Sequence, residues 1–200
     1  MISILFQLAI AGALSAPGDR IHESLAPLGS PSDHEVETPA VEAAGIEVDG
    51  RLDDEAWEHA VLLDGFTQFS PIEGSEATQD THILVLVDAE AIYFAVKAFD
   101  ESPALIRATL TDRDSYTYTD DYVRFILDTF DDQRRAYVFT VNPYGVQHDG
   151  LWNEIGGGTG RRGRGMFSPI DDNPDFLWES DAELTPWGYQ VEIRIPFKSL

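Results

Sequence analysis

Apolar residues recur at every second position in several short runs of this sequence. In DYVRFILD, residues 121–128, one alternating set carries valine, phenylalanine and leucine, and the other carries tyrosine, arginine, isoleucine and aspartate. Such alternation is typical of a β-strand with one face on a hydrophobic core. In THILVLVD, residues 81–88, both sets contain large aliphatic residues, which predicts a central strand covered on both faces.

Similar runs predict about seven or eight strands, separated by turn sequences such as DAEA and NPYG. Only one helix is expected, and it is short. Asp53 is a suitable N-cap residue, and Trp57 lies on the apolar side of the turn that follows, which predicts that Trp57 packs in the core. The pattern therefore indicates an all-β domain, an antiparallel β-sandwich with one short N-terminal helix.

The first 40 residues follow a different pattern. Residues 2–16 carry no charge and end in small residues, which is typical of a secretory signal peptide, although the basic start is missing. A buried N-terminal segment and a lipid-facing anchor are the alternatives. Residues 17–40 are rich in proline, serine and acidic residues and predict a disordered linker. We therefore expect a signal peptide at 1–16, a linker at 17–40 and the folded domain at 41–200, in an exported protein that is periplasmic, outer-membrane-associated or extracellular.

Composition excludes several classes of function. The chain has 36 acidic and 13 basic residues and a net charge of −23, so nucleic acid and anionic membranes are not expected as partners. It has no cysteine, which excludes disulfides, thiolate metal sites and a cysteine nucleophile. The five histidines lack the spacing of a histidine metal site. The glycine–arginine segment 156–165 lacks the lysine followed by serine or threonine of a phosphate-binding loop.

Acidic residues cluster at the loops and strand ends around residues 121–128. Calcium takes six to eight oxygen ligands, many of them carboxylates, from such positions. Carboxylates there also hydrogen-bond polar ligands, act in acid–base chemistry or simply remain solvated, and the sequence leaves these roles open. No motif marks a catalytic carboxylate pair or a nucleophile, so the sequence favours a non-catalytic segment and leaves its enzymatic status open.

Five motifs occur in the order IEVDGRLDDEAWEHA, LVDAEAIYFAVKAFDESP, DDYVRFILDTFDD, YVFTVNPYGVQHDG and GYQVEIRIPFKSL. Together they resemble carbohydrate-binding module family 9, over about residues 46–200. The most similar version is the one found at the N-terminus of large secreted or outer-membrane proteins, ahead of a β-barrel region. The resemblance implies a β-sandwich that binds a saccharide or polysaccharide, often with bound calcium. It also implies a module in carbohydrate catabolism whose hydrolase activity on O-glycosyl compounds lies in an attached region.

The resemblance further implies site residues. The family holds a sugar between two aromatic rings, and the position of the first is Tyr118. A glutamate and an arginine of the family correspond here to Arg124 and Thr140, so the charge pattern differs. The second ring lies beyond Leu200, so we expect an incomplete C-terminus and a longer chain with a membrane-associated C-terminal region. The expected sugar-binding residues are Tyr118, Tyr122, Arg124 and Trp152. The expected calcium ligands are Asp112, Asp114, Asp120, Asp121 and Asp128.

The alternative is a structural cap or interaction domain of an outer-membrane β-barrel protein, without sugar binding. Four aromatic residues distinguish the two hypotheses: Tyr118, Trp152, Trp178 and Trp187. A sugar-binding module should expose two or more of them together. A structural cap should bury them or use them in a protein interface.

Overall fold

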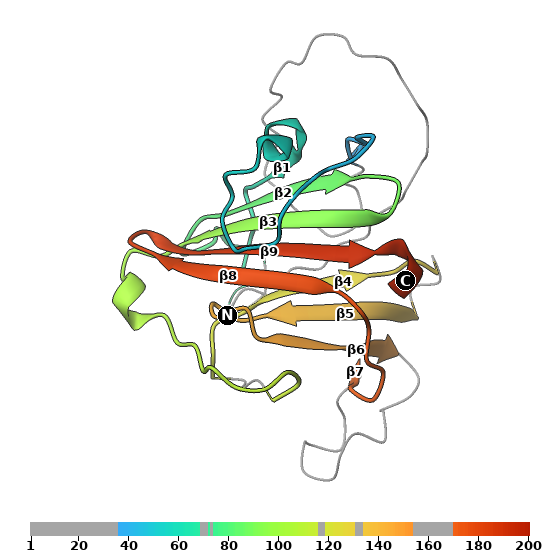
Figure 1. Ribbon diagram of the computed structural model, residues 1–200. Coiled ribbons are helices and arrows are strands. Elements are labelled where there is room, and N and C mark those ends of the chain that lie inside the picture. The colour runs from blue at the N-terminus through green and yellow to red at the C-terminus, as the bar shows by residue number, and fades with distance from the viewer. Residues whose placement is uncertain (1–35, 69–71, 73, 116–118, 131–133, 154–169) are drawn as a thin grey trace.

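The computed structural model describes residues 36–68, 72, 74–115, 119–130, 134–153 and 170–200 of the 200-residue chain. Within these residues, nine strands form two antiparallel sheets that lie face to face (Figure 1). The prediction of an all-β domain built from two antiparallel sheets is confirmed. The predicted signal peptide, residues 17–35 of the predicted linker and the glycine–arginine segment lie outside the described residues.

The larger sheet has five strands in the order β1-β2-β3-β9-β8. Their bounds are β1 Val61–Leu63, β2 Thr81–Val87, β3 Ala91–Phe99, β8 Glu179–Thr185 and β9 Gly188–Pro196. The strand predicted to be covered on both faces is β2. It lies inside the sheet, with Ile83 and Val85 in the main core and Leu86 in a second core on the opposite face.

The smaller sheet has four strands in the order β4-β5-β6-β7. Their bounds are β4 Val123–Leu127, β5 Arg135–Val141, β6 Gln147–Asn153 and β7 Ile170–Asp171. The alternation in DYVRFILD places Val123, Phe125 and Leu127 in the core, as predicted. The rings of Phe94 and Phe125 meet between the sheets with centroids 4.3 Å apart. The other face of this sheet, opposite the core, is called the outer face below.

The segment before β1 covers the far side of the larger sheet. It includes the 3-10 helix η1, Glu55–His59, and the predicted burial of Trp57 is confirmed. The sequence predicted Asp53 as the N-cap residue, but the N-cap of η1 is the next residue, Asp54. Its side chain makes no capping bond and accepts the backbone N–H of Glu47 at 3.2 Å instead. Two further 3-10 helices are η2 Pro103–Leu105 and η3 Phe197–Ser199.

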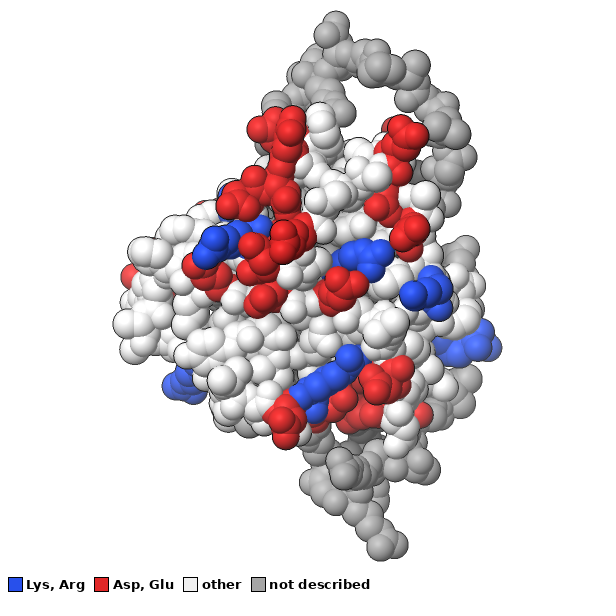
Figure 2. All heavy atoms as spheres, in the orientation of Figure 1, with Lys and Arg blue, Asp and Glu red and all other residues white. Residues whose placement is uncertain are grey.

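The described chain already contacts the sandwich before residue 41. The N–H of Val87 donates to the carbonyl of Pro39 at 3.1 Å, and the N–H of Val41 donates to the carbonyl of Val87 at 2.9 Å. Figure 2 shows acidic side chains gathered over the upper part of one face, where η1 and this segment lie. Within the part of the chain that the structure describes, no helix is long and apolar enough to span a membrane.

Candidate functional site

The outer face of the four-stranded sheet brings several predicted site residues onto one surface. Strand register places Arg124, Thr140 and His148 side by side across β4, β5 and β6. Because side chains alternate along a strand, Tyr122 and Trp152 point to the same face as this row. Arg124 and Thr140, which the family resemblance matched to a glutamate and an arginine, are paired positions on neighbouring strands.

Arg124 is held in place from two sides. Its Nε donates a hydrogen bond to Thr140 Oγ1 at 2.9 Å, and its guanidinium lies 4.9 Å from the centroid of the Tyr122 ring. The Tyr122 side chain was expected to face outward to solvent, but the residue is only 5% exposed. Its ring therefore supports the guanidinium and does not form an open stacking surface. A guanidinium above an aromatic face is a favourable cation–π pair.

Exposure divides the outer face into a closed centre and open margins. Val138, Thr140 and His148 are buried at its centre, whereas Arg124 and Trp152 are partly exposed. Trp152 lies on β6, four residues beyond His148, and pairs with Ala136 on β5. Arg124 lies on β4, two strands away from β6, in the row that contains His148. Standard sheet spacings put the two about 16 Å apart. Tyr118, the predicted stacking residue, lies outside the described residues.

Asp120 and Asp121, at the start of β4, bind the backbone of an earlier loop. Asp120 is buried, and it accepts hydrogen bonds from Thr109 N at 2.8 Å and Thr109 Oγ1 at 3.0 Å. Asp121 Oδ2 accepts the N–H of Arg107 at 2.8 Å. These two carboxylates therefore fix the loop that follows η2 against the sandwich.

The other predicted calcium ligands have different surroundings. Asp128 accepts the N–H of Phe130 at 3.0 Å and closes a turn. Asp114 has a left-handed backbone, φ 61°, and its Oδ1 is 3.4 Å from His148 Nδ1. Asp112 is exposed in the same loop. Across the described ranges, no group of three or more acidic or histidine side chains is placed to hold a metal ion. Calcium binding stays a prediction.

We expect calcium to raise the melting temperature if such a site forms, because an ion bound only by the folded state stabilises it. Melting curves in millimolar calcium and in excess chelator measure the effect. The double variant D112N/D114N is expected to abolish any difference, because it removes two predicted ligands. Identical curves for the wild-type domain in the two conditions would remove the metal hypothesis.

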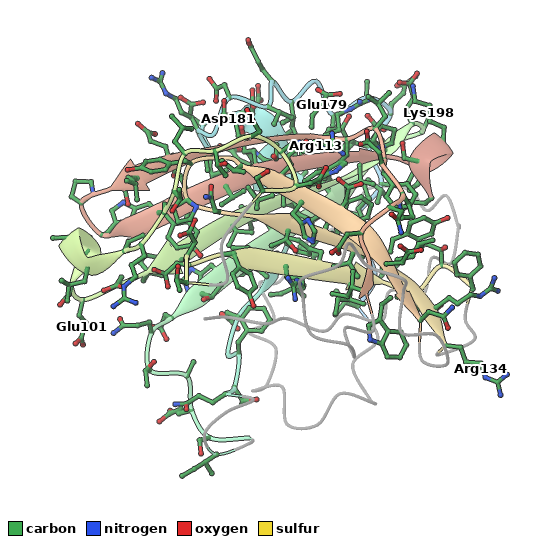
Figure 3. All side chains as sticks on the ribbon, turned by 90° about the horizontal axis from the view of Figure 1, so that it is seen from below. Glu101, Arg113, Arg134, Glu179, Asp181 and Lys198 are labelled. Carbon is green, nitrogen blue, oxygen red and sulfur yellow. The ribbon has the colours of Figure 1, made fainter. Side chains whose placement is uncertain are left out.

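Sequence reasoning missed a buried polar cluster at one end of β6. Asp149 is 1% exposed and accepts hydrogen bonds from Arg113 Nη2 at 2.6 Å, Phe176 N at 2.7 Å and Trp178 Nε1 at 3.2 Å. Arg113 is labelled in Figure 3. The only local signal was a carboxylate at a core-facing position of the alternating run VQHDGLW. The Asp149 carboxylate ties the loop after η2 and the segment before β8 to the sheet.

Of the four aromatic residues that distinguish the two hypotheses, the three that the structure describes lie on different surfaces or in the core. Trp178 is 3% exposed and belongs to the core, where its ring meets Phe139 with centroids 5.2 Å apart. Trp152 and Trp187 are partly exposed, but Trp152 lies on β6 and Trp187 lies in the turn between β8 and β9 of the other sheet. An exposed pair on one surface is therefore not found among the described residues.

Comparisons with known proteins agree with the predicted fold. No protein-family model matches the sequence, and no curated protein does either. The structure is similar to a carbohydrate-binding module family 9 from Caldicellulosiruptor kristjanssonii in complex with cellotriose. The TM-score is 0.51 at 18% identity, over 79% of this chain and 66% of that chain. A structure of such a module from the same organism in complex with glucose gives the same score and identity, over 79% and 68%.

At this level of identity the similarity concerns the fold. The chain has a β-sandwich like that of carbohydrate-binding module family 9, as the five motifs predicted. It spans about two thirds of the length of the modules it matches, 66% and 68%.

Proposed function

We propose that this domain binds a saccharide at the margins of the outer face of the four-stranded sheet. The observation that carries the proposal is the partly exposed Arg124 guanidinium, which Thr140 and Tyr122 hold in a fixed orientation. The fold adds support, because the modules with the same fold were solved with cellotriose or glucose. Preorganised polar groups beside an aromatic side chain are typical of small-ligand sites.

The partly exposed side chains of Arg124 and Trp152 both have chemistry that suits a sugar. A guanidinium carries N–H donors in a planar fork, which match sugar hydroxyls as acceptors. The indole of Trp152 offers an apolar face to the C–H side of a sugar ring. Because the two lie about 16 Å apart by sheet spacing, one ring contacts one of them, and a chain of several units contacts both.

We expect the wild-type domain to bind cellotriose more tightly than glucose. Loss of a hydrogen bond to a charged group costs about 1.5–3 kcal/mol, so R124A should weaken cellotriose binding about tenfold or more. W152A should weaken it about three- to tenfold through lost stacking, and W152F should retain most of the affinity. Isothermal titration calorimetry measures each dissociation constant. R51A, which removes an exposed arginine from the covering segment of the other sheet, is the matched control and should bind as the wild type does.

We also propose that the domain acts as a non-catalytic part of an exported, longer protein of polysaccharide catabolism. The signal-like residues 2–16 and the five motifs support this proposal. N-terminal sequencing of the mature protein from an expressing cell tests export. A mature protein that still begins at Met1 would contradict a cleaved signal peptide.

The structural cap is the second candidate function. The burial of Tyr122 and Trp178 favours it, because these rings stabilise the domain and are closed to a ligand. A cap binds neither cellotriose nor glucose at millimolar concentration, with or without the R124A change. The calorimetric titration therefore separates the two candidates.

A further inference from the structure

A half-open cavity of about 260 Å³ lies at one end of the five-stranded sheet. Asp64, Phe66, Asp80 and His82 line it. Within the described part of the chain, no hydrogen bond or ion pair engages the carboxylates of Asp64 and Asp80, so they can accept hydrogen bonds from a ligand. The cavity therefore combines an aromatic wall with two acceptors, and none of its residues belongs to the proposed site on the other sheet.

Three aromatic rings form a row beside this cavity. The ring centroids of His82 and Phe99 are 5.0 Å apart in an edge contact, and those of Phe99 and Trp187 are also 5.0 Å apart. All three residues are partly exposed. His82 both lines the cavity and begins the row, so the row starts at the cavity wall and continues through Phe99 to Trp187.

Main-chain hydrogen bonds from the end of β3 hold both parts of this surface. The N–H of Phe99 donates to the carbonyl of Asp80 at 3.0 Å, and the N–H of Asp100 donates to the carbonyl of Trp187 at 2.9 Å. Side chains mounted on a rigid scaffold bind a ligand at a smaller entropic cost than side chains on a free loop. The cavity wall and the far end of the aromatic row are therefore preorganised.

The cavity is separate from the Trp152 margin of the outer face. Figure 3 labels Glu101, which follows β3 by two residues, and Arg134, which precedes β5, at opposite ends of the molecule. Trp152 lies at the Arg134 end, because Arg135 pairs with Asn153. The cavity lies at the Glu101 end, because Asp80 is bonded to Phe99.

We propose that this cavity is a second saccharide site, which takes a single sugar ring that is neutral or carries an amino group. Phe66 and His82 meet the apolar face of the ring, and Asp64 and Asp80 accept hydrogen bonds from its hydroxyl or ammonium groups. A uronate is repelled by the two carboxylates. The cavity lies just below the range of about 300–1,000 Å³ for drug-sized ligands, so it suits one ring and not a chain.

The indole N–H signals of the four tryptophans test this proposal in a nitrogen-15-labelled domain. Titration with glucosamine should shift the Trp187 signal in a saturable manner, glucose should do so more weakly, and glucuronate should not. D80N should weaken glucosamine binding at least about fivefold, because an amide replaces a charged acceptor. Asp80 is exposed, so this variant should fold normally. D175N, which changes an exposed carboxylate next to Arg113, should leave glucosamine binding unchanged.

Three outcomes would overturn the second site. They are an unchanged Trp187 signal at high millimolar glucosamine, equal affinity of D80N and the wild type, and glucuronate binding as tight as glucosamine binding. A shift of the Trp152 signal alone would also overturn it while supporting the proposed function. Saturable shifts of Trp187 in a domain that binds no cellotriose would support the second site and contradict the site proposed on the outer face of the four-stranded sheet.

Discussion

Replacing Asp149 with alanine is expected to lower the free energy of unfolding by about 2–6 kcal/mol, because two N–H donors lose their acceptor at about 1–3 kcal/mol each. The Asp149 carboxylate is 1% exposed and accepts hydrogen bonds from Arg113 Nη2, Phe176 N and Trp178 Nε1. Alanine leaves Trp178 Nε1 and the N–H of Phe176 without this acceptor, whereas the Arg113 side chain is 33% exposed and keeps the Phe176 carbonyl at 2.6 Å. Urea unfolding followed by circular dichroism measures the loss.

The same arginine provides the control. Arg113 Nη2 also lies 3.0 Å from Asp175 Oδ1, and the side chain of Asp175 is 76% exposed. Exposed ion pairs contribute about 0–1 kcal/mol, so D175A should change the free energy of unfolding very little. Equal losses for D149A and D175A would contradict the view that burial gives Asp149 its effect.

Raising the pH from about 4 to about 8 is expected to destabilise the domain by about 3 kcal/mol through Glu192 alone. Glu192 is fully buried on β9, and burial raises its pKa from 4.5 to about 7. Hydrogen bonds from Trp57 Nε1 at 2.9 Å, Asp49 N at 3.0 Å and Gly50 N at 3.1 Å oppose the increase only in part.

The sign follows from proton binding. The folded state binds the proton of Glu192 more tightly than the unfolded chain does, so protonation stabilises the fold. This contribution is fully present below about pH 4.5, the unfolded value, and is lost as the pH rises through about 7. Urea unfolding at several pH values measures it in the wild type.

Two variants isolate the effect of Glu192 from that of the other acids. E192Q should lower stability at every pH, because an amide cannot accept all three N–H groups, and it should remove the pH dependence assigned to this residue. E183Q, an exposed glutamate on neighbouring β8, should keep the wild-type dependence. The assignment is wrong if E192Q and the wild type lose the same free energy between about pH 5 and pH 8.

The local pattern of apolar residues predicted much of the fold. Alternation identified β4 and placed Phe125 in the core. It missed β1 and β7, which have three and two residues and are too short to show a period. It also carried no information on which strands pair, because β3 and β9 are adjacent in the sheet but far apart in the sequence.

The site was predictable only in part, for a physical reason. Alternation assigns a side chain to a face, so it placed Tyr122 and Arg124 on the outer face of the sheet. It does not show what covers that face, so the burial of Tyr122 was not expected. The hydrogen bonds of Asp120 to Thr109 and of Asp121 to Arg107 join a strand end to a distant loop, and no local pattern encodes them.

Amide chemical-shift mapping with cellotriose tests the proposed function most directly. Saccharide binding at the outer face predicts saturable shifts at Arg124 and at Trp152, on the two open margins of the four-stranded sheet, and at Thr140, which bonds Arg124. R124A should reduce these shifts at equal cellotriose concentration. The absence of any shift in the wild-type domain at millimolar cellotriose, or shifts confined to other surfaces, would contradict the account.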